Sequence, residues 1–391
     1  MSNQEPTPLA QEMTAQIQLG LPGTVGKLAR QLREVDRIAP RLKEGGVVRK
    51  VAMVRDQKRR SVGLSHARRS IHAFGGVLYG AAAVSHELTT EGADLAHTGQ
   101  LSRMDVGDLS FLEYEKRIEW RCLGALYELL EEIFEEDELP DYVLLNCPFV
   151  FGLQLYAHVL EEGEEDRLDI FLKDELEALK ERIENFWIRN RSRCFPYNPA
   201  GPKVVSLHTG RLNEPLKALE GKGLMKSPDH IDPDVENLMR NDWNDVISVG
   251  LERLLLGILR PSYRTAAFER EYGKLDYRAF PQELKNSGTL AFHYLSGLRA
   301  DPVHVETIGS ADDWEAQGGS EAIDQVAGDL MALTYFDSKK AVPLPLWYAQ
   351  QAVQVVKKKR ILEFYKRETL RAMQEEQVDQ AWMAGWEEDN V

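Results

Sequence analysis

The most distinctive hydrophobic pattern in the chain is a short apolar run without polar alternation, Asp141–Pro148 (Asp-Tyr-Val-Leu-Leu-Asn-Cys-Pro). A run of this length predicts a strand covered on both faces, as in the middle of an α/β sheet. The run ends on the polar residue Asn146, where the chain leaves the predicted sheet. Active-site groups of α/β folds lie at such strand ends, so Asn146 is a candidate site residue.

Helical periodicity dominates three long stretches of the sequence. Residues Leu109–Glu136 carry apolar side chains on one face and predict a long helix. The pattern from Leu9 to Leu42 is also helical, and the stretch around Pro22 predicts a break into two helices. A last long helix is expected from Leu346 to Gln377. Further helical segments are predicted at Leu153–Leu160, Leu168–Ile188, Leu212–Leu219, in parts of Asp234–Leu259, and from Ser320 to about Phe336.

Strand-like runs alternate with these helices. Runs at Ser61–Leu64 and Gly75–Val84 predict a hairpin linked through the basic segment Ser65–Phe74. Residues 87–108 are expected to form a loop or a meander. Other strands are predicted at Val47–Val54, Lys203–His208, Thr289–Leu295 and Val303–Ile308, the last two as an antiparallel pair.

This order of elements predicts an α/β protein with a mixed sheet flanked by helices. We expect an N-terminal helical segment over residues 1–45 and one domain over residues 46–391. Insertions are expected at about 161–200 and 268–288.

Two glutamates, Glu115 and Glu119, fall on the apolar face of the predicted helix Leu109–Glu136. Glutamate is almost never fully buried unless it is paired, so these side chains need a cation, a hydrogen-bond network or water. One interpretation is an ion pair with Lys116, Arg117 or Arg121, and the other is a metal-binding or catalytic role.

Composition places the chain among ordinary globular proteins, with 43% hydrophobic and 28% charged residues. No apolar run approaches the roughly 18–20 residues of a membrane span, and the polar N-terminus does not resemble a signal peptide. The three cysteines, Cys122, Cys147 and Cys194, form no CxxC pair. We interpret them as reduced thiols of a cytoplasmic protein without membrane attachment.

The formal net charge of −15 is unevenly distributed. Between Arg41 and Arg69 there are ten basic and two acidic residues, and Lys357–Arg360 begins a second basic cluster. Two basic islands on an acidic body favour either a local phosphate-binding track or simply solvated faces. The candidate nucleic-acid-binding residues are Arg55, Lys58, Arg59, Arg60, Arg68, Arg69, Lys358, Lys359 and Arg360.

The common catalytic fingerprints are missing from the sequence. It contains no GxxxxGK[ST] phosphate loop, no GxGxxG after a strand, no GxSxG elbow and no HExxH. Its nine histidines are scattered and form no recognisable metal-binding pair.

Several segments resemble motifs of the NurA nuclease family. Ala332–Val353 is similar to the family's final motif, in which a Tyr-Pro-x-Pro-Leu segment precedes a helix beginning x-x-Ala-His. His293–Arg299 and Val303–Glu306 resemble its last two strands, and Leu259–Thr265 resembles its Pro-Gly-x-Arg-Ser turn. The resemblance extends over most of residues 10–375.

The resemblance implies an RNase H-like core in a homodimer. The family is a metal-dependent 5′–3′ exonuclease and endonuclease that digests DNA with manganese, docked on a HerA-type hexameric ATPase in DNA repair and end resection. Such chemistry uses carboxylates, because Mn²⁺ and Mg²⁺ prefer oxygen ligands. In the family a histidine on the last helix completes the site.

Matched position by position, most of the family's site is substituted in this chain. Ser65 stands where the first strand carries aspartate, and Asn146 replaces the aspartate of the second strand. Gln350 stands in place of the final histidine. Only the helix glutamate remains, best matched by Glu119 with Glu115 one turn away. Glu119 is therefore the one candidate metal ligand, for Mn²⁺ or Mg²⁺ if the protein is active, and binding of no metal is the alternative.

We therefore predict a NurA-like DNA-processing protein with a degraded nuclease site, which binds DNA and a HerA-like ATPase as a homodimer. One alternative is an active Mn²⁺-dependent nuclease with a rearranged site. Another is a structural or interaction protein of the same fold that binds no DNA and serves in defence against phage or in a plasmid module. A third is an unrelated α/β enzyme.

Overall fold

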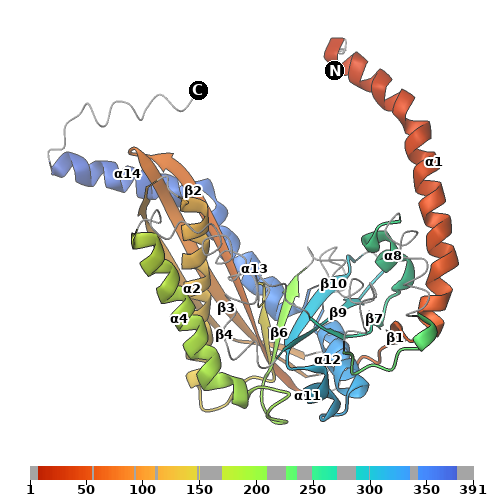
Figure 1. Cartoon of the computed structure of the whole chain (residues 1–391). Coiled ribbons are helices and arrows are strands. Elements are labelled where there is room, and N and C mark those ends of the chain that lie inside the picture. Colours follow the sequence, from red (N-terminus) through yellow and green to blue (C-terminus); the bar gives the residue numbers. More distant parts are fainter. Residues whose placement is uncertain are drawn as a thin grey trace.

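The computed structural model describes residues 8–54, 57–91, 94–110, 113–147, 149, 170–208, 226–235, 249–270, 288–298, 300–334 and 342–376. One long sheet carries helices on both faces. The C-terminal part of helix α1 (Pro8–Glu44) packs against helix α8 (Leu251–Ile258), and its N-terminal part extends away from the rest of the molecule (Figure 1). The predicted mixed sheet flanked by helices is confirmed. The other helices are α2 (Tyr114–Glu135), α4 (Ile170–Asn190), the 3-10 helix η1 (Arg191–Arg193), α8 (Leu251–Ile258), α11 (Ala311–Glu315), α12 (Ser320–Ala332), α13 (Leu344–Lys357) and α14 (Lys359–Glu375).

The sheet has ten strands in the order β1-β7-β9-β10-β6-β5-β2-β3-β4, and β8 pairs with β9. β5 runs parallel to both of its neighbours, β2 and β6. All four residues of β5 are buried, which confirms the predicted central strand. The strand bounds are β1 Val48–Lys50, β2 Arg59–Ala73, β3 Gly76–Glu91, β4 Asp94–Leu109, β5 Tyr142–Leu145, β6 Lys203–His208, β7 Tyr263–Thr265, β8 Phe268–Glu269, β9 Thr289–Leu295 and β10 Val303–Ile308.

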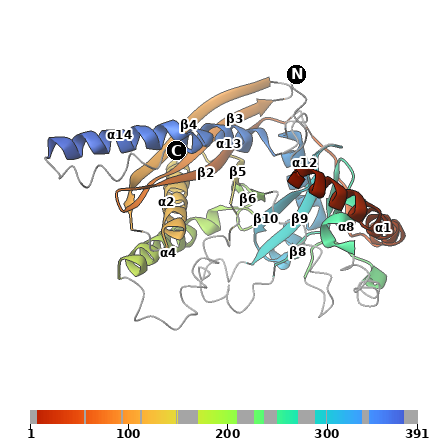
Figure 2. The same cartoon turned by 90° about the horizontal axis from the view of Figure 1, so that it is seen from above.

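Two hydrophobic layers lie on opposite faces of the strands around β5. Val143 of β5 packs in a cluster with α2 and α4, whereas Leu144 packs in a cluster with α12 and α13. This alternation follows from strand geometry, in which successive side chains point to opposite faces. α13 and α14 follow each other along one face of β2 and β3, with α2 on the other side (Figure 2).

β2 and β3 form the predicted hairpin, but both strands are longer than the sequence pattern indicates. Phe74 and Gly75 make the turn with φ angles of 54° and 70°, and a two-residue type I′ turn requires positive values at both positions. The expectation that Ser65–Phe74 is a linker is wrong, because β2 stays paired with β3 until Ala73 lies opposite Gly76. The arginines of this segment, Arg68 and Arg69, contact helices, and Arg68 is also exposed to solvent. Residues 87–108 form the end of β3 and most of β4, which is a meander.

The predicted break in the N-terminal helix is also wrong. α1 is continuous over 37 residues with Pro22 inside it. A proline removes one backbone hydrogen bond and can bend a helix without ending it. α1 ends at Glu44, next to the expected boundary at residues 45 and 46.

The expected last helix is two helices, because Lys358 has an extended backbone with φ −71° and ψ 127°. Contacts with the sheet explain the division. The Arg69 guanidinium donates a 2.5 Å hydrogen bond to the Lys357 carbonyl at the end of α13. Beyond the division, Leu362 is fully buried next to Gly80 of β3.

Several predicted features lie outside the described residues. These are the helices Leu153–Leu160 and Leu212–Leu219, most of the helical stretch before α8, and, of the two expected insertions, residues 161–169 and 271–287. Within the described part of the chain, none of the helices combines the length and hydrophobicity needed to cross a bilayer. All three cysteines are buried free thiols.

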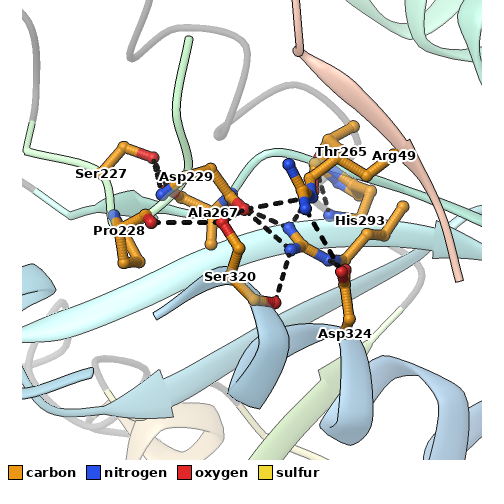
Figure 3. A network of polar contacts seen from close by, with 10 residues as sticks. Arg49, Ser227, Pro228, Asp229, Thr265, Ala267, His293, Ser320 and Asp324 are labelled. Atoms are coloured by element: carbon orange, nitrogen blue, oxygen red, sulfur yellow. Dashed lines mark hydrogen bonds and ion pairs between the residues drawn. The ribbon is translucent and has the colours of Figure 1, made fainter. Parts of the chain in front are cut away.

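A buried ion-pair network fixes β7 to α12 (Figure 3). Arg264 donates to both carboxylate oxygens of Asp229 at 2.7 and 2.8 Å and to Asp324 at 2.6 Å. The side chains of Arg264 and Asp229 are fully buried. Burial alone would raise the pKa of Asp229, but hydrogen bonds and charge from Arg264 outweigh it and hold the pKa below 3.8. Arg264 belongs to the segment that resembles the family's Pro-Gly-x-Arg-Ser turn, and its role in the described structure is to join these elements.

Candidate functional site

The end of β5 brings Asn146 next to Ser65, which lies in the middle of β2. Leu64 lies opposite Leu145 in the parallel pair, so Ser65 and Asn146 are the next residues along the two neighbouring segments. The Asn146 backbone N–H donates to the Leu64 carbonyl at 2.9 Å, and its side-chain Nδ2 donates to Ser65 Oγ at 3.1 Å. Two of the substituted positions therefore contact each other through neutral groups.

α13 crosses directly over Ser65. Two residues before it, a Cβ added to Gly63 would lie 2.3 Å from the Leu346 backbone nitrogen, so only glycine permits this approach. Two residues after it, Ala67 packs in one cluster with Val353 of α13. The turn of α13 between these two contacts contains Gln350.

The orientation of α13 places Gln350 on the flank nearer β5. On the other flank, the Tyr348 ring stacks on the His86 ring of β3 with centroids 5.0 Å apart. Gln350 lies two residues on, about 200° around the helix axis, and so faces away from β3. α13 also contacts β5, which leads to Asn146. The three substituted positions thus lie around the end of β5.

Glu119 lies on the other face of the sheet from Ser65. Its carboxylate forms an ion pair of 2.8 Å with Arg68, which is three residues after Ser65 in β2 and therefore points to the opposite face. Arg68 also donates to the backbone carbonyl of Glu115, whose side chain is exposed. Burial raises the pKa of Glu119, and the Arg68 charge partly offsets this effect. The surviving glutamate is thus paired with a guanidinium and does not contact the Ser65–Asn146 pair.

The arginine that pairs with Glu119 comes from a strand and not from the helix itself. Glu119 forms an ion pair, as one interpretation of the sequence suggested, but its partner is not one of the basic residues expected from its own helix. Arg117 and Arg121 both bind Glu175 of α4, at 2.9 and 2.8 Å.

Most arginines of the first basic island have structural partners. Arg59 is buried and forms a 2.5 Å ion pair with Asp329 of α12. Arg60 pairs with Glu87 of β3 at 2.7 Å and also with Glu136. Arg68 pairs with Glu119 of α2, and Arg69 donates to the end of α13. Four of the predicted DNA-binding residues therefore connect the sheet to its helices.

The remaining basic candidates differ in exposure. Lys58 precedes β2 and is exposed, and Lys358 and Arg360 are exposed at the junction of α13 and α14. Arg55 lies outside the described residues, as does the side chain of Lys359. The second basic island is therefore more accessible than the first.

One buried carboxylate escaped the sequence analysis. Glu306 of β10 is fully buried, accepts hydrogen bonds from Arg270 at 2.6 Å and the Phe149 backbone at 3.3 Å, and lies 3.1 Å from His304. Val303–Ile308 forms the predicted antiparallel strand, β10, and both of its faces are buried. Its arginine partner makes Glu306 part of a buried ion pair near the end of β5.

No metal site is formed by these acids. Within the residues that the structure describes, no group of three or more histidine, cysteine, aspartate or glutamate side chains is placed to hold a metal ion. The described acids near the strand ends, Glu119 and Glu306, are each matched by an arginine.

β2–β4 form an antiparallel meander, β5 runs parallel to β2, and α2 packs on the meander, which is the RNase H-like arrangement of elements. The crystal structure of the NurA nuclease from Sulfolobus solfataricus superposes with a TM-score of 0.54 at 10% sequence identity, covering 94% of this chain and 98% of that chain. The chain therefore has a NurA-like fold. An endonuclease V structure from Bacillus subtilis gives a TM-score of 0.33 at 10% identity, covering 85% of this chain and 92% of that chain. No sequence-family model and no curated protein sequence matches the chain.

Proposed function

We propose that this protein is a NurA-like DNA-processing protein in which neutral side chains have replaced the metal-binding centre of the nuclease. The observation that carries the proposal is the hydrogen bond between Asn146, at the end of β5, and Ser65 of the parallel strand β2. In a NurA-like fold, these are the positions that the sequence resemblance assigns to aspartates.

The chemistry of this pair does not suit a divalent cation. Mn²⁺ and Mg²⁺ favour charged carboxylate oxygens, which offset the loss of their hydration water. Ser65 and Asn146 supply neutral oxygens, and the amide nitrogen of Asn146, a donor, is directed at the serine hydroxyl. Glu119 is paired with Arg68 across the sheet. The residues present therefore do not fit the metal that the fold implies, and we derive no cleavage step through it.

A second copy of the chain is the partner we propose for α1. The side chains of Leu21, Val25, Leu28 and Leu32 are spaced four, three and four residues apart, and each is 37–56% exposed. This is the spacing of a coiled-coil seam, and a stripe of this kind on an isolated helix is stable only when another helix covers it. The stripe supports the homodimer that the family resemblance implies. The proposed HerA-like ATPase partner follows from that resemblance.

Incubation of the purified protein with linear DNA and Mn²⁺ tests the proposal. We expect no digestion, and a Glu119→Gln variant is expected to behave like the wild type. Robust digestion that Glu119→Gln abolishes would show an active, rearranged site.

A gel shift across a salt series tests the DNA-binding part of the proposal. Phosphate contacts weaken steeply as salt rises, so binding is expected at low salt and lost at high salt. Failure to bind DNA at any salt concentration would favour the structural or interaction protein of the same fold.

A further inference from the structure

One face of α14 carries a stripe of arginines interrupted by an aromatic residue. Arg360, Phe364, Arg367 and Arg371 are spaced four, three and four residues apart and are all exposed. Phe364 is 56% exposed, and the side chains of Arg367 and Arg371 are each 72% exposed. At 100° per residue the four side chains fall within about 60° of one another, over a length of about 16 Å. We call them the α14 stripe.

The opposite face of α14 is anchored on the sheet. Leu362 is fully buried, and its Cδ2 lies 3.5 Å from the position of a Cβ added to Gly80 of β3. Leu362 is about 200° from Arg360 around the helix axis, so the α14 stripe points away from the sheet. Figure 1 shows α14 extending along the end of the β2–β3 hairpin.

The arginines of the α14 stripe differ from those of the first basic island in their partners. Arg367 lies 3.6 Å from Glu368, and Arg371 lies 3.4 Å from Glu375, all on the exposed helix surface. Exposed pairs of this kind contribute little, because water and salt screen them. The arginines are therefore available to another anion.

The aromatic residue is held beside the cations. The Arg367 guanidinium lies 5.3 Å from the centroid of the Phe364 ring. An exposed phenylalanine adds nothing to phosphate binding, but a base without a pairing partner can stack on it. An acidic protein surface would match the arginines and leave the phenylalanine without a role.

We propose that the α14 stripe binds single-stranded nucleic acid, with the arginines contacting phosphates and Phe364 stacking on a base. The stripe is as long as four to five nucleotides at a rise of roughly 3.4 Å. This inference deepens the proposed DNA-processing function and rests on it, but it concerns a surface separate from the Ser65–Asn146 pair.

The test uses the full-length protein and a fluorescent 20-nucleotide oligo(dT), with affinity measured by anisotropy at several salt concentrations. The triple variant Arg360→Gln, Arg367→Gln, Arg371→Gln is expected to bind at least tenfold more weakly, with a salt slope smaller by about two, since each strand phosphate contributes about 0.7. A control with the same charge change, Lys27→Gln, Arg30→Gln, Arg33→Gln on α1, is expected to bind like the wild type.

A second variant separates stacking from charge. Phe364→Ala is expected to weaken oligo(dT) binding about tenfold and to leave duplex binding unchanged, because paired bases are not free to stack. Circular dichroism and melting temperature verify that each variant is folded. If the wild type binds DNA and the α14 variants bind equally well, the assignment of this surface is wrong while the proposed function stands. If the wild type binds no DNA, both are wrong.

Discussion

The side-chain amide of Asn146 donates a 3.1 Å hydrogen bond to the hydroxyl of Ser65, at the point where β5 ends beside the parallel strand β2. Two carboxylates at these positions would repel each other and would need a cation between them. Serine and asparagine satisfy each other without one. The pair thus links the end of β5 to β2 by a neutral hydrogen bond, where two carboxylates would need a cation.

Replacing both residues by aspartate should create a dependence on metal. The double variant Ser65→Asp, Asn146→Asp is expected to be less stable than the wild type in EDTA, because like charges meet at the end of β5. Added Mn²⁺ should raise its melting temperature by about 2 °C or more, since the ion binds only the folded state. The same rise in the wild type would contradict the view that its centre holds no metal.

Loss of the buried arginine in the network of Figure 3 should be severely destabilising. Arg264→Met leaves the carboxylates of Asp229 and Asp324 without their main partner, and breaking a buried ion pair in this way costs about 3–5 kcal/mol. Urea denaturation followed by circular dichroism measures the change. Lys226→Ala, which removes an exposed ion pair with Asp312, is the control and should leave the urea midpoint unchanged.

The same network predicts an acid-dependent loss of stability. The pKa of Asp229 is lower in the folded protein than its ordinary value of 3.8, so its contribution is complete above that value and is lost as the pH falls below it. In urea titrations from pH 7 to pH 3, the wild type should therefore lose more stability than Asp229→Asn. If the two proteins lose the same stability between pH 7 and pH 3, Asp229 is not the source of the acid-dependent loss.

The close approach of α13 to β2 should make Gly63 intolerant of any side chain. Gly63→Ala brings a methyl group within 2.3 Å of the Leu346 backbone and should destabilise the protein by about 1–3 kcal/mol. The matched control is Gly124→Ala in α2, where nothing lies within 4 Å of the added Cβ. That change should instead stabilise the protein by about 0.5–1 kcal/mol, because alanine loses less entropy in a helix. Equal effects of the two substitutions on the urea midpoint would refute the packing argument.

The stripe on α1 predicts the assembly state. Replacing Leu21, Val25, Leu28 and Leu32 by glutamine should convert a dimer into a monomer, because it removes the apolar seam. Light scattering coupled to size-exclusion chromatography measures the mass. Lys27→Gln with Arg30→Gln on the same helix should leave the mass unchanged, and a wild type that is monomeric at all concentrations would exclude the proposed homodimer.

Sequence patterns located the central features of this fold because those features are local. The unbroken apolar run of β5 predicts a strand buried on both faces, and its final polar residue marks the edge where Asn146 meets Ser65. The contact itself follows from the parallel pairing of β5 with β2, which places Asn146 beside Ser65.

The errors arose where distant parts of the chain decide the structure. Arg68 and Arg69 look like a solvated loop in the sequence, but helices far along the chain provide their partners. No proline or glycine at Lys358 signals the division between α13 and α14 in the sequence. Contacts of these helices with β2 and β3 accompany the division. Glu306 was missed because the pairing residue, Arg270, lies in another strand connection.

Two adjacent residues of β2 connect this strand to helices on opposite faces of the sheet. Arg68 contacts α2 on one face, and Arg69 contacts the end of α13 on the other face. A single peptide unit therefore joins the attachment points of both helix layers, and α14 begins immediately after one of them.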